Sequence, residues 1–288
     1  MKNKKRIFWS LALLFLFLLL LFPFFLWWQI YEPQESKNLP SAYTGDENII
    51  NILLLGSDQR EDEPARADTI MVVSLSRTQK DISLLSIPRD SRVWISGHGL
   101  DKINHAMQFG GVALLRQTVE NLLAVPLDYY MLTNFDGFAG IIDAVGGVEV
   151  DVEMQIIGLD GRPIVNAGRH KLNGRQALTY VRFRSDAGGD FGRMRRQQQV
   201  MKALFQQARQ PKSFLRLPLV AKELAQHVRT DLTITELFAL ARFAQDCKQE
   251  IAAVRLRGEV ALIDGISYVL LDETFLRTAV EQYLWRNR

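Results

Sequence analysis

The chain has 288 residues, a formal net charge of only +3 and 48% hydrophobic residues, enough for one large domain or two small ones with a substantial core. Its single cysteine, Cys247, excludes an internal disulfide, so the core has to be stable without covalent cross-links. Arginine outnumbers lysine, and arginine is suited to two-point binding of phosphate and carboxylate groups.

The amino-terminal segment predicts one membrane-spanning helix. An apolar run from Ile7 to Ile30 would form a helix of roughly 36 Å at 1.5 Å per residue, long enough to cross a bilayer. Basic residues precede the run, Trp27 and Trp28 lie near its end, and no small-x-small cleavage site follows. A buried core helix is the alternative, but the basic flank argues against it. We therefore expect a cytoplasmic tail at residues 1–6, an uncleaved anchor at 7–30 in the cell membrane, and an extracytoplasmic remainder.

The first strands of the folded part end in acidic residues. A polar tether at residues 31–47 leads to one predicted domain at 48–288. Its first two apolar runs, residues 51–55 and 69–75, are typical of strands, and they place Asp58 and Asp68 at neighbouring strand ends. Two such carboxylates can hold a divalent cation, with Arg60 and Arg66 left to bind phosphate oxygens. The alternative is that both acids are ordinary loop residues.

A third apolar run, residues 82–87, ends in another charged pair, Arg89 and Asp90. In open α/β sheets ligands bind beyond the carboxyl ends of strands, so this pair joins Asp58 and Asp68 if the strands run in the required directions. A turn with a solvated arginine is the alternative. Lys102 follows as a candidate phosphate contact, whereas His98 and His105 lack metal-like spacing and are interpreted as structural or rim residues.

Strands and helices alternate along the rest of the chain, which predicts a layered α/β domain. Helical periodicity covers residues 112–123, 135–145, 214–228, 233–246 and 273–285, and strand-like runs cover 129–133, 148–152, 251–256 and 266–271. Thr233 with Glu236 three residues later predicts a capped helix start.

An arginine-rich stretch forms the second candidate site. If residues 180–184 are extended, Arg182 and Arg184 share one face, and a following helix to about residue 208 places Arg193 and Gln197 one turn apart. A solvated basic face, or a patch for acidic lipid or nucleic acid, would also be rich in arginine. A solvated face usually interleaves acids with its bases, and the expected extracytoplasmic position argues against nucleic acid. The pattern favours an anionic ligand.

The motifs G-S-D-Q-R, A-R-A-D-T-I, S-I-P-R-D, D-K-I-N-H-A, A-L-T-Y-V-R-F-R and G-D-F-G-R-M-R-R-Q-Q occur in this order behind one anchor. As a set they resemble the LytR-CpsA-Psr family of cell-wall proteins over most of residues 50 to 210. Beyond residue 210 the resemblance is looser, and Ala67 stands where the family often has serine.

The resemblance implies a three-layer α/β/α sandwich with a central mixed sheet, and a cavity for a polyprenyl chain. It also implies a Mg²⁺-dependent phosphotransferase that moves a glycopolymer, such as teichoic acid or capsule, from polyprenyl pyrophosphate to peptidoglycan. The 6-hydroxyl of an N-acetylmuramic acid residue would attack the sugar-linked phosphorus, and polyprenyl monophosphate would leave.

Site residues follow from the same resemblance and from the local reasoning above. The expected metal ligands are Asp58 and Asp68, and either of them or Asp190 is the candidate proton acceptor. The expected pyrophosphate contacts are Arg60, Arg66, Arg89, Lys102, Arg182, Arg184, Arg193 and Gln197, with Arg89 also assigned to catalysis. Two alternatives use the same residues: a pyrophosphatase with water as the nucleophile, and a non-catalytic envelope regulator of the transcriptional-attenuator type.

Overall fold

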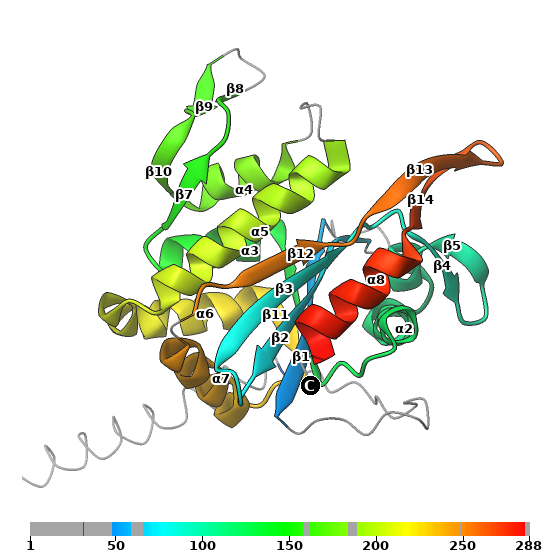
Figure 1. Cartoon of the computed structure of the whole chain (residues 1–288). Helices are drawn as coiled ribbons and strands as arrows, with labels where there is room; N and C mark the ends of the chain where they lie inside the picture. The colour runs from blue at the N-terminus through cyan, green and yellow to red at the C-terminus, as the bar shows by residue number, and fades with distance from the viewer. Residues whose placement is uncertain are drawn as a thin grey trace, which may run out of the picture.

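A mixed six-stranded sheet lies at the centre of the computed structural model, in the order β11-β6-β1-β2-β3-β12 (Figure 1). Its strands are β1 (Ile49–Ser57), β2 (Ala67–Ser76), β3 (Asp81–Ile87), β6 (Tyr129–Asn134), β11 (Val228–Thr230) and β12 (Ala252–Arg255). β1 pairs parallel to β6, β2 runs antiparallel to both β1 and β3, and β12 is parallel to β3. Strands β1, β3, β6 and β12 therefore end at one edge, which we call the carboxyl edge.

The structure describes Tyr31 and residues 48–58, 66–157, 162–183, 189–247 and 249–285. The predicted anchor at 7–30 and most of the tether at 31–47 lie outside these residues, as do Arg60 and Arg184. In the part of the chain that the structure describes, no helix is long and apolar enough to cross a membrane. Tyr31 forms an isolated parallel bridge with Thr230, so the chain beyond the predicted anchor meets the sheet at β11.

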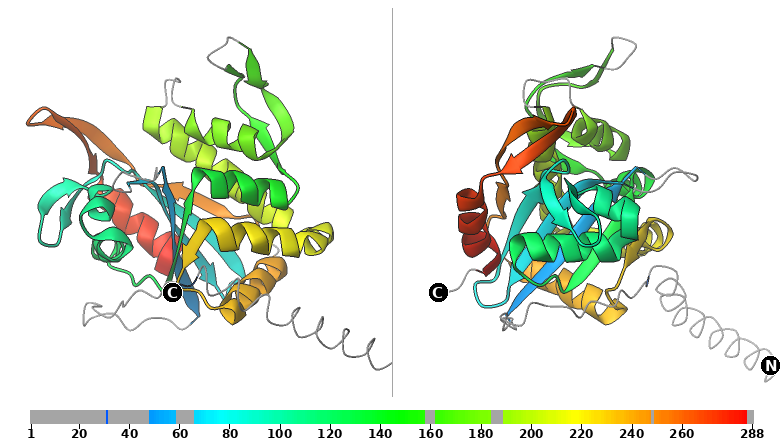
Figure 2. Two further views of the ribbon diagram at one scale, coloured as in Figure 1. Left: turned by 180° about the vertical axis from the view of Figure 1, so that it is seen from behind. Right: turned by 90° about the vertical axis from the view of Figure 1, so that its right-hand side faces the viewer.

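Helices cover both faces of the sheet (Figure 2), which agrees with the expected sandwich. On one face, the apolar side chains of β1–β3 pack against α2 (His105–Leu123), α8 (Glu273–Val280) and the π-turn η2 (Glu281–Trp285). On the other face, they pack against α5 (Gly189–Ala208) and α7 (Ile234–Asp246). Alternate residues of each strand supply the two cores because successive side chains of a strand point to opposite faces.

A third core lies beyond α5. It joins α3 (Phe135–Ala144), α4 (Gly174–Arg182), β7 (Val148–Val152) and β10 (Gly168–Leu172). The 3₁₀ turn η1 (Pro211–Arg216) leads into α6 (Leu217–His227). Three hairpins complete the fold: β4 (Arg92–Ile95) with β5 (Gly99–Lys102), β8 (Ile156–Ile157) with β9 (Pro163–Val165), and β13 (Gly258–Ile263) with β14 (Ile266–Leu271).

Two sequence predictions are wrong. Residues 180–182 are not extended but form the last turn of α4, which begins with a capping box between Asn173 and Gln176 and buries Ala177 and Tyr180. The predicted helix at 214–228 is divided between η1 and α6, and its last residue, Val228, begins strand β11. The predicted capping box of Thr233 and Glu236 at the start of α7 is confirmed.

A buried ion-pair network ties α2 to the β6 side of the sheet. Arg116 is 5% exposed, and its Nη1 lies 3.0 Å from Asp231 while its Nη2 donates to the carbonyl of Leu127. Glu120 accepts from the backbone N–H of Leu127 at 3.0 Å. Burial raises the pKa of Glu120 and of Asp231, although Arg116 opposes the shift in both. The two carboxylates therefore depend on Arg116 for compensation.

The substitution Arg116→Met is expected to lower the free energy of unfolding by about 3–5 kcal/mol, because it leaves buried carboxylates without a counter-charge. The matched control is Arg277→Met on α8, whose side chain is 78% exposed and 3.8 Å from Glu273, and which should cost about 0.5 kcal/mol or less. Denaturant unfolding measures both. Because protonation neutralises these carboxyls, the loss should be full at neutral pH and shrink as the pH falls through their raised pKa values. Equal losses for the two variants would contradict the prediction.

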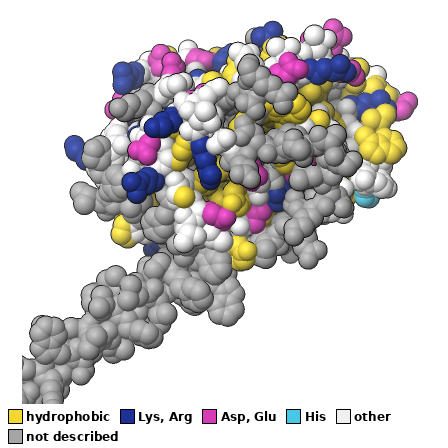
Figure 3. All heavy atoms as spheres, turned by 60° about the horizontal axis from the view of Figure 1, so that its bottom comes forward, with side chains coloured by type: hydrophobic (Ala, Val, Ile, Leu, Met, Phe, Trp, Pro, Cys, Tyr) yellow, Lys and Arg dark blue, Asp and Glu magenta, His cyan; other side chains and the backbone are white. Residues whose placement is uncertain are grey.

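One face of the molecule carries charged side chains of both signs. On the face shown in Figure 3, basic and acidic side chains are interspersed, with hydrophobic side chains between them. Such interleaving is usual for a solvated surface. A group of side chains that all carry the same sign of charge differs from this pattern and is therefore a candidate ligand site.

Candidate active site

The carboxyl edge brings the predicted acidic and basic residues together. Ser57, at the end of β1, pairs with Ala67 at the start of β2, and Ile70 of β2 pairs with Ile87 at the end of β3. Asp58 and Asp68 therefore lie at neighbouring strand ends, as predicted. Because β3 runs antiparallel to β2, the segment after Ile87 reaches the same edge, so the condition set for Arg89 and Asp90 is met.

A register shift in β2 sets the backbone at Asp68. Gly56 pairs with Thr69 and Ser57 pairs with Ala67, which leaves Asp68 opposite no residue of β1. Such a bulge changes the direction of a side chain and is common beside active sites. A Cβ atom at Gly56 would lie only 3.1 Å from the Cβ of Thr69, so glycine allows the close approach of the two strands here. The bulge explains how the side chain of Asp68, a residue within β2, can point toward the carboxyl edge.

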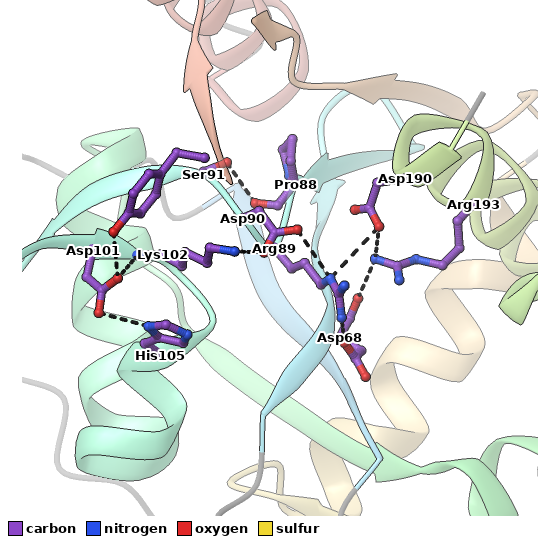
Figure 4. Close-up of polar contacts among 11 residues, drawn as sticks. Asp68, Pro88, Arg89, Asp90, Ser91, Asp101, Lys102, His105, Asp190 and Arg193 are labelled. Atoms are coloured by element: carbon purple, nitrogen blue, oxygen red, sulfur yellow. Dashed lines mark hydrogen bonds and ion pairs between the residues drawn. The ribbon is translucent and has the colours of Figure 1, made fainter. Parts of the chain in front are cut away.

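Arg89 is at the centre of the cluster (Figure 4). Its guanidinium forms an ion pair and hydrogen bond with Asp68, and its Nε lies 3.5 Å from Asp90 and 3.8 Å from Asp190. Burial alone would lower the pKa of Arg89, but the three carboxylates outweigh it and raise that pKa. The guanidinium is therefore a permanent positive charge held among acids, with its side chain 22% exposed.

The first two turns of α5 add a second guanidinium. Arg193 lies 2.7 Å from Asp190, three residues earlier, and its Nη2 is 3.5 Å from the backbone oxygen of Asp68. One turn further, Gln197 donates to the hydroxyl of Thr69 at 2.9 Å. The predicted shared face of Arg193 and Gln197 is thus confirmed, and it points to the start of β2. Arg193 is 3% exposed, so its position is set by packing.

The β4–β5 hairpin supplies Lys102, whose Nζ lies 3.0 Å from Asp90. Next to it, Asp101 accepts from the backbone N–H of Lys102 at 2.7 Å and lies 2.8 Å from Nδ1 of His105. Burial alone would raise the pKa of Asp101, but the hydrogen bond to His105 and the one from Lys102 lower it. The ring of His105 is held by Asp101, which agrees with its interpretation as a structural or rim residue.

Several predicted residues have no contact with this cluster among those that the structure describes. Arg66 is exposed and donates to Gln108 of α2 at 3.2 Å. The guanidinium of Arg182 lies 4.3 Å from the ring centre of Phe135, so it stacks on α3. Asp58 is exposed at the end of β1. Arg60 and Arg184 lie outside the described residues, so their roles stay predictions.

Sequence reasoning missed one buried residue that supports the site. Gln198 is 2% exposed, donates to Ser86 at 2.8 Å and to the carbonyl of Val254 at 2.6 Å, and accepts from Arg255 at 2.9 Å. It therefore binds α5 to β3 and β12. Its position directly after Gln197, in a run of polar residues on a helix, was the available signal, but its partners are distant in sequence.

Comparisons with known proteins agree with the fold and the motifs. A family model described as the LytR_cpsA_psr family matches residues 29–283. The chain belongs to the LytR-CpsA-Psr family. The resemblance drawn from the motifs is therefore confirmed, and the match extends beyond residue 210.

The chain is similar in sequence to named transferases and in structure to solved proteins. The polyisoprenyl-teichoic acid–peptidoglycan teichoic acid transferase TagU of Bacillus mycoides is 35% identical over 247 residues, covering 83% of this chain and 81% of that protein. TagU of Bacillus licheniformis is 32% identical, covering 96% of this chain and 94% of that protein. Among solved structures, B. subtilis TagV matches with a TM-score of 0.73 at 30% identity, covering 85% of this chain and all of that one. A structure titled "TagT bound to LI-WTA" matches with a TM-score of 0.73 at 28% identity, covering 88% and 97%.

Proposed function

We propose that this protein is a phosphotransferase that moves a glycopolymer, such as teichoic acid, from a polyprenyl-pyrophosphate carrier to peptidoglycan through a phosphodiester bond. The observation that carries the proposal is the cluster at the carboxyl edge, where Arg89 and Arg193 lie among Asp68, Asp90 and Asp190. Relatives named teichoic acid transferases cover most of the chain and support it. We also propose the topology expected from the sequence, with an anchor at residues 7–30 and the domain outside the cytoplasm.

Phosphoryl transfer needs positive charge where negative charge develops, and little covalent work from the protein. Arg89 and Arg193 present guanidinium groups from two different elements, a strand end and a helix. A pyrophosphate bound between them would take over hydrogen bonds that the carboxylates now accept. The peptidoglycan hydroxyl would then attack the sugar-linked phosphorus, polyprenyl monophosphate would leave, and Asp58, Asp68 or Asp190 would accept the proton.

The site offers too few described ligands for a metal held by protein alone, but enough for a Mg²⁺ ion that also binds water and substrate phosphate. Among the described residues, no three His, Cys, Asp or Glu side chains are grouped closely enough to hold a metal ion. Mg²⁺ often needs only one or two carboxylates, because waters and substrate phosphates complete its coordination. Asp58 and Asp68, at adjoining strand ends, are the pair we propose. When bound, Mg²⁺ would neutralise charge on the phosphate oxygens.

The test uses the full-length protein in detergent with a synthetic polyprenyl-pyrophosphate glycan and peptidoglycan fragments, with Mg²⁺ or with a chelator. Mass spectrometry should detect phosphodiester-linked glycan on the fragments, with at least a tenfold loss when Mg²⁺ is removed. Release of glycan phosphate without attachment would instead identify a pyrophosphatase. Tight binding of the donor without turnover would identify a regulator.

A further inference from the structure

A groove of about 360 Å³ lies beside the candidate active site, along β12, the last strand of the sheet. Its lining includes Phe191 of α5, Arg255 of β12, Arg257, and Phe275 and Gln282 from the α8–η2 segment. Phe191 directly follows Asp190 along α5. Because Arg255 pairs with Ser86 in parallel strands, β12 ends at the same edge as β3, so the groove continues the line of strand ends that carries Arg89.

The groove is positively charged. Neither Arg255 nor Arg257 forms an ion pair with any carboxylate that the structure describes, and Arg255 has the neutral Gln198 as its hydrogen-bond partner at 2.9 Å. Burial, and then the neighbouring charges of Arg195 and Arg257, lower the pKa of Arg255, and the carboxylate of Glu153 only partly opposes this shift. Of the two nearby guanidinium groups, that of Arg195 forms an ion pair with Glu153 at 2.5 Å, whereas that of Arg257 forms none with a described residue. This differs from the face of mixed charge shown in Figure 3.

The geometry of Arg257 suits an anionic ligand. Its guanidinium carbon lies 4.4 Å from the ring centre of Phe275, and a guanidinium stacked on an aromatic ring keeps its N–H groups free to bind in its own plane. A purely structural role accounts for Arg255, which positions Gln198. It does not account for Arg257, which is exposed and contacts that ring.

The other lining residues narrow the ligand class. Phe191 and Phe275 provide apolar surface, and Gln282 and Thr278 carry groups that can hydrogen-bond to hydroxyls. Two cations with aromatic and polar neighbours match a phosphodiester flanked by the carbon and hydroxyl groups of a sugar or polyol.

We propose that this groove is a second anion subsite, which holds a phosphodiester of the donor's polymer while the pyrophosphate occupies the site around Arg89. The inference rests on the proposed function and extends it to a preference for polymers that carry phosphate in their repeats. No bond changes in the groove. It contributes binding that is the same in the ground state and the transition state, so it acts on KM rather than on kcat.

The experiment compares two polyprenyl-pyrophosphate donors, one with a disaccharide alone and one with the same disaccharide followed by several polyol-phosphate units. Full-length wild type, Arg257→Gln and the double variant Arg255→Gln, Arg257→Gln are assayed with both donors. The control is Arg277→Gln, which removes an exposed arginine of α8. We expect KM for the phosphate-bearing donor to rise severalfold in Arg257→Gln and about tenfold in the double variant, with KM for the disaccharide donor and kcat unchanged in Arg257→Gln.

Three outcomes would overturn the proposal. An unchanged KM would show that the groove does not bind the donor, and an equal rise with both donors would show an indirect effect on the site. A rise only in KM for the peptidoglycan fragment would assign the groove to carboxylates of the acceptor. If the double variant misfolds, Arg257→Gln alone still tests the groove, because Arg257 has no contact with Gln198 among those described. If wild type turns over neither donor, the proposed function fails, and direct binding of both donors by titration still tests the groove.

Discussion

Arg89→Ala is expected to lower kcat/KM for glycopolymer transfer by about 10²–10³ fold, the usual cost of removing one charge-stabilising donor from an active site. The variant loses the guanidinium that contacts Asp68 and lies near Asp90 and Asp190. The negative charge of these carboxylates would then be less compensated near the donor pyrophosphate, so the donor would bind more weakly and the chemical step would be slower. Steady-state transfer assays, read as attached glycan, measure the effect.

The matched control for Arg89 is Arg169→Ala on β10, which removes an arginine that is 79% exposed and 2.7 Å from Glu149. It should retain wild-type activity. Arg89→Lys keeps the charge but not the paired N–H groups, so it should recover part of the loss. A fully active Arg89→Ala protein would remove Arg89 from the site. A loss of activity accompanied by unfolding in circular dichroism would point to a structural role instead.

Asp68→Asn should reduce kcat by at least about 10² fold and raise the Mg²⁺ concentration needed for half-maximal activity. The amide is close in shape to the carboxylate and keeps an oxygen that can accept from Arg89, so the bulge in β2 should survive. What it loses is the negative charge that a hard divalent cation requires. A titration of Mg²⁺ against transfer rate separates this effect from a general loss of activity.

For Asp68, the control is Asp264→Asn in the exposed turn of the β13–β14 hairpin, where the backbone φ of 52° is one that asparagine accepts. It should leave both the rate and the Mg²⁺ requirement unchanged. If Asp68→Asn lowers the rate but leaves the Mg²⁺ requirement as in wild type, Asp68 is not a metal ligand. Its role would then be limited to orienting Arg89.

Local sequence patterns were sufficient for the elements that carry the site. Apolar runs bounded by glycine, proline and charged residues located β1, β2 and β3, and the one-turn spacing of Arg193 and Gln197 identified their shared face on α5. They failed at residues 180–182. There the alternation of arginine with Val181 and Phe183 resembled a strand, but the helix started by the capping box of Asn173 and Gln176 continued through Arg182.

The sequence by itself determined the strand ends, the helix starts, the family and the residue types of the site, because these depend on interactions among neighbours along the chain. Only the tertiary structure decided which charges meet. Asp68 and Arg193 are 125 residues apart, and the contact between them depends on α5 packing across the start of β2. The groove at Arg255 and Arg257 likewise requires β12 to add to β3 in parallel, a pairing between segments far apart in the chain. Strand order and helix packing are properties of the whole core, so no local pattern predicts them.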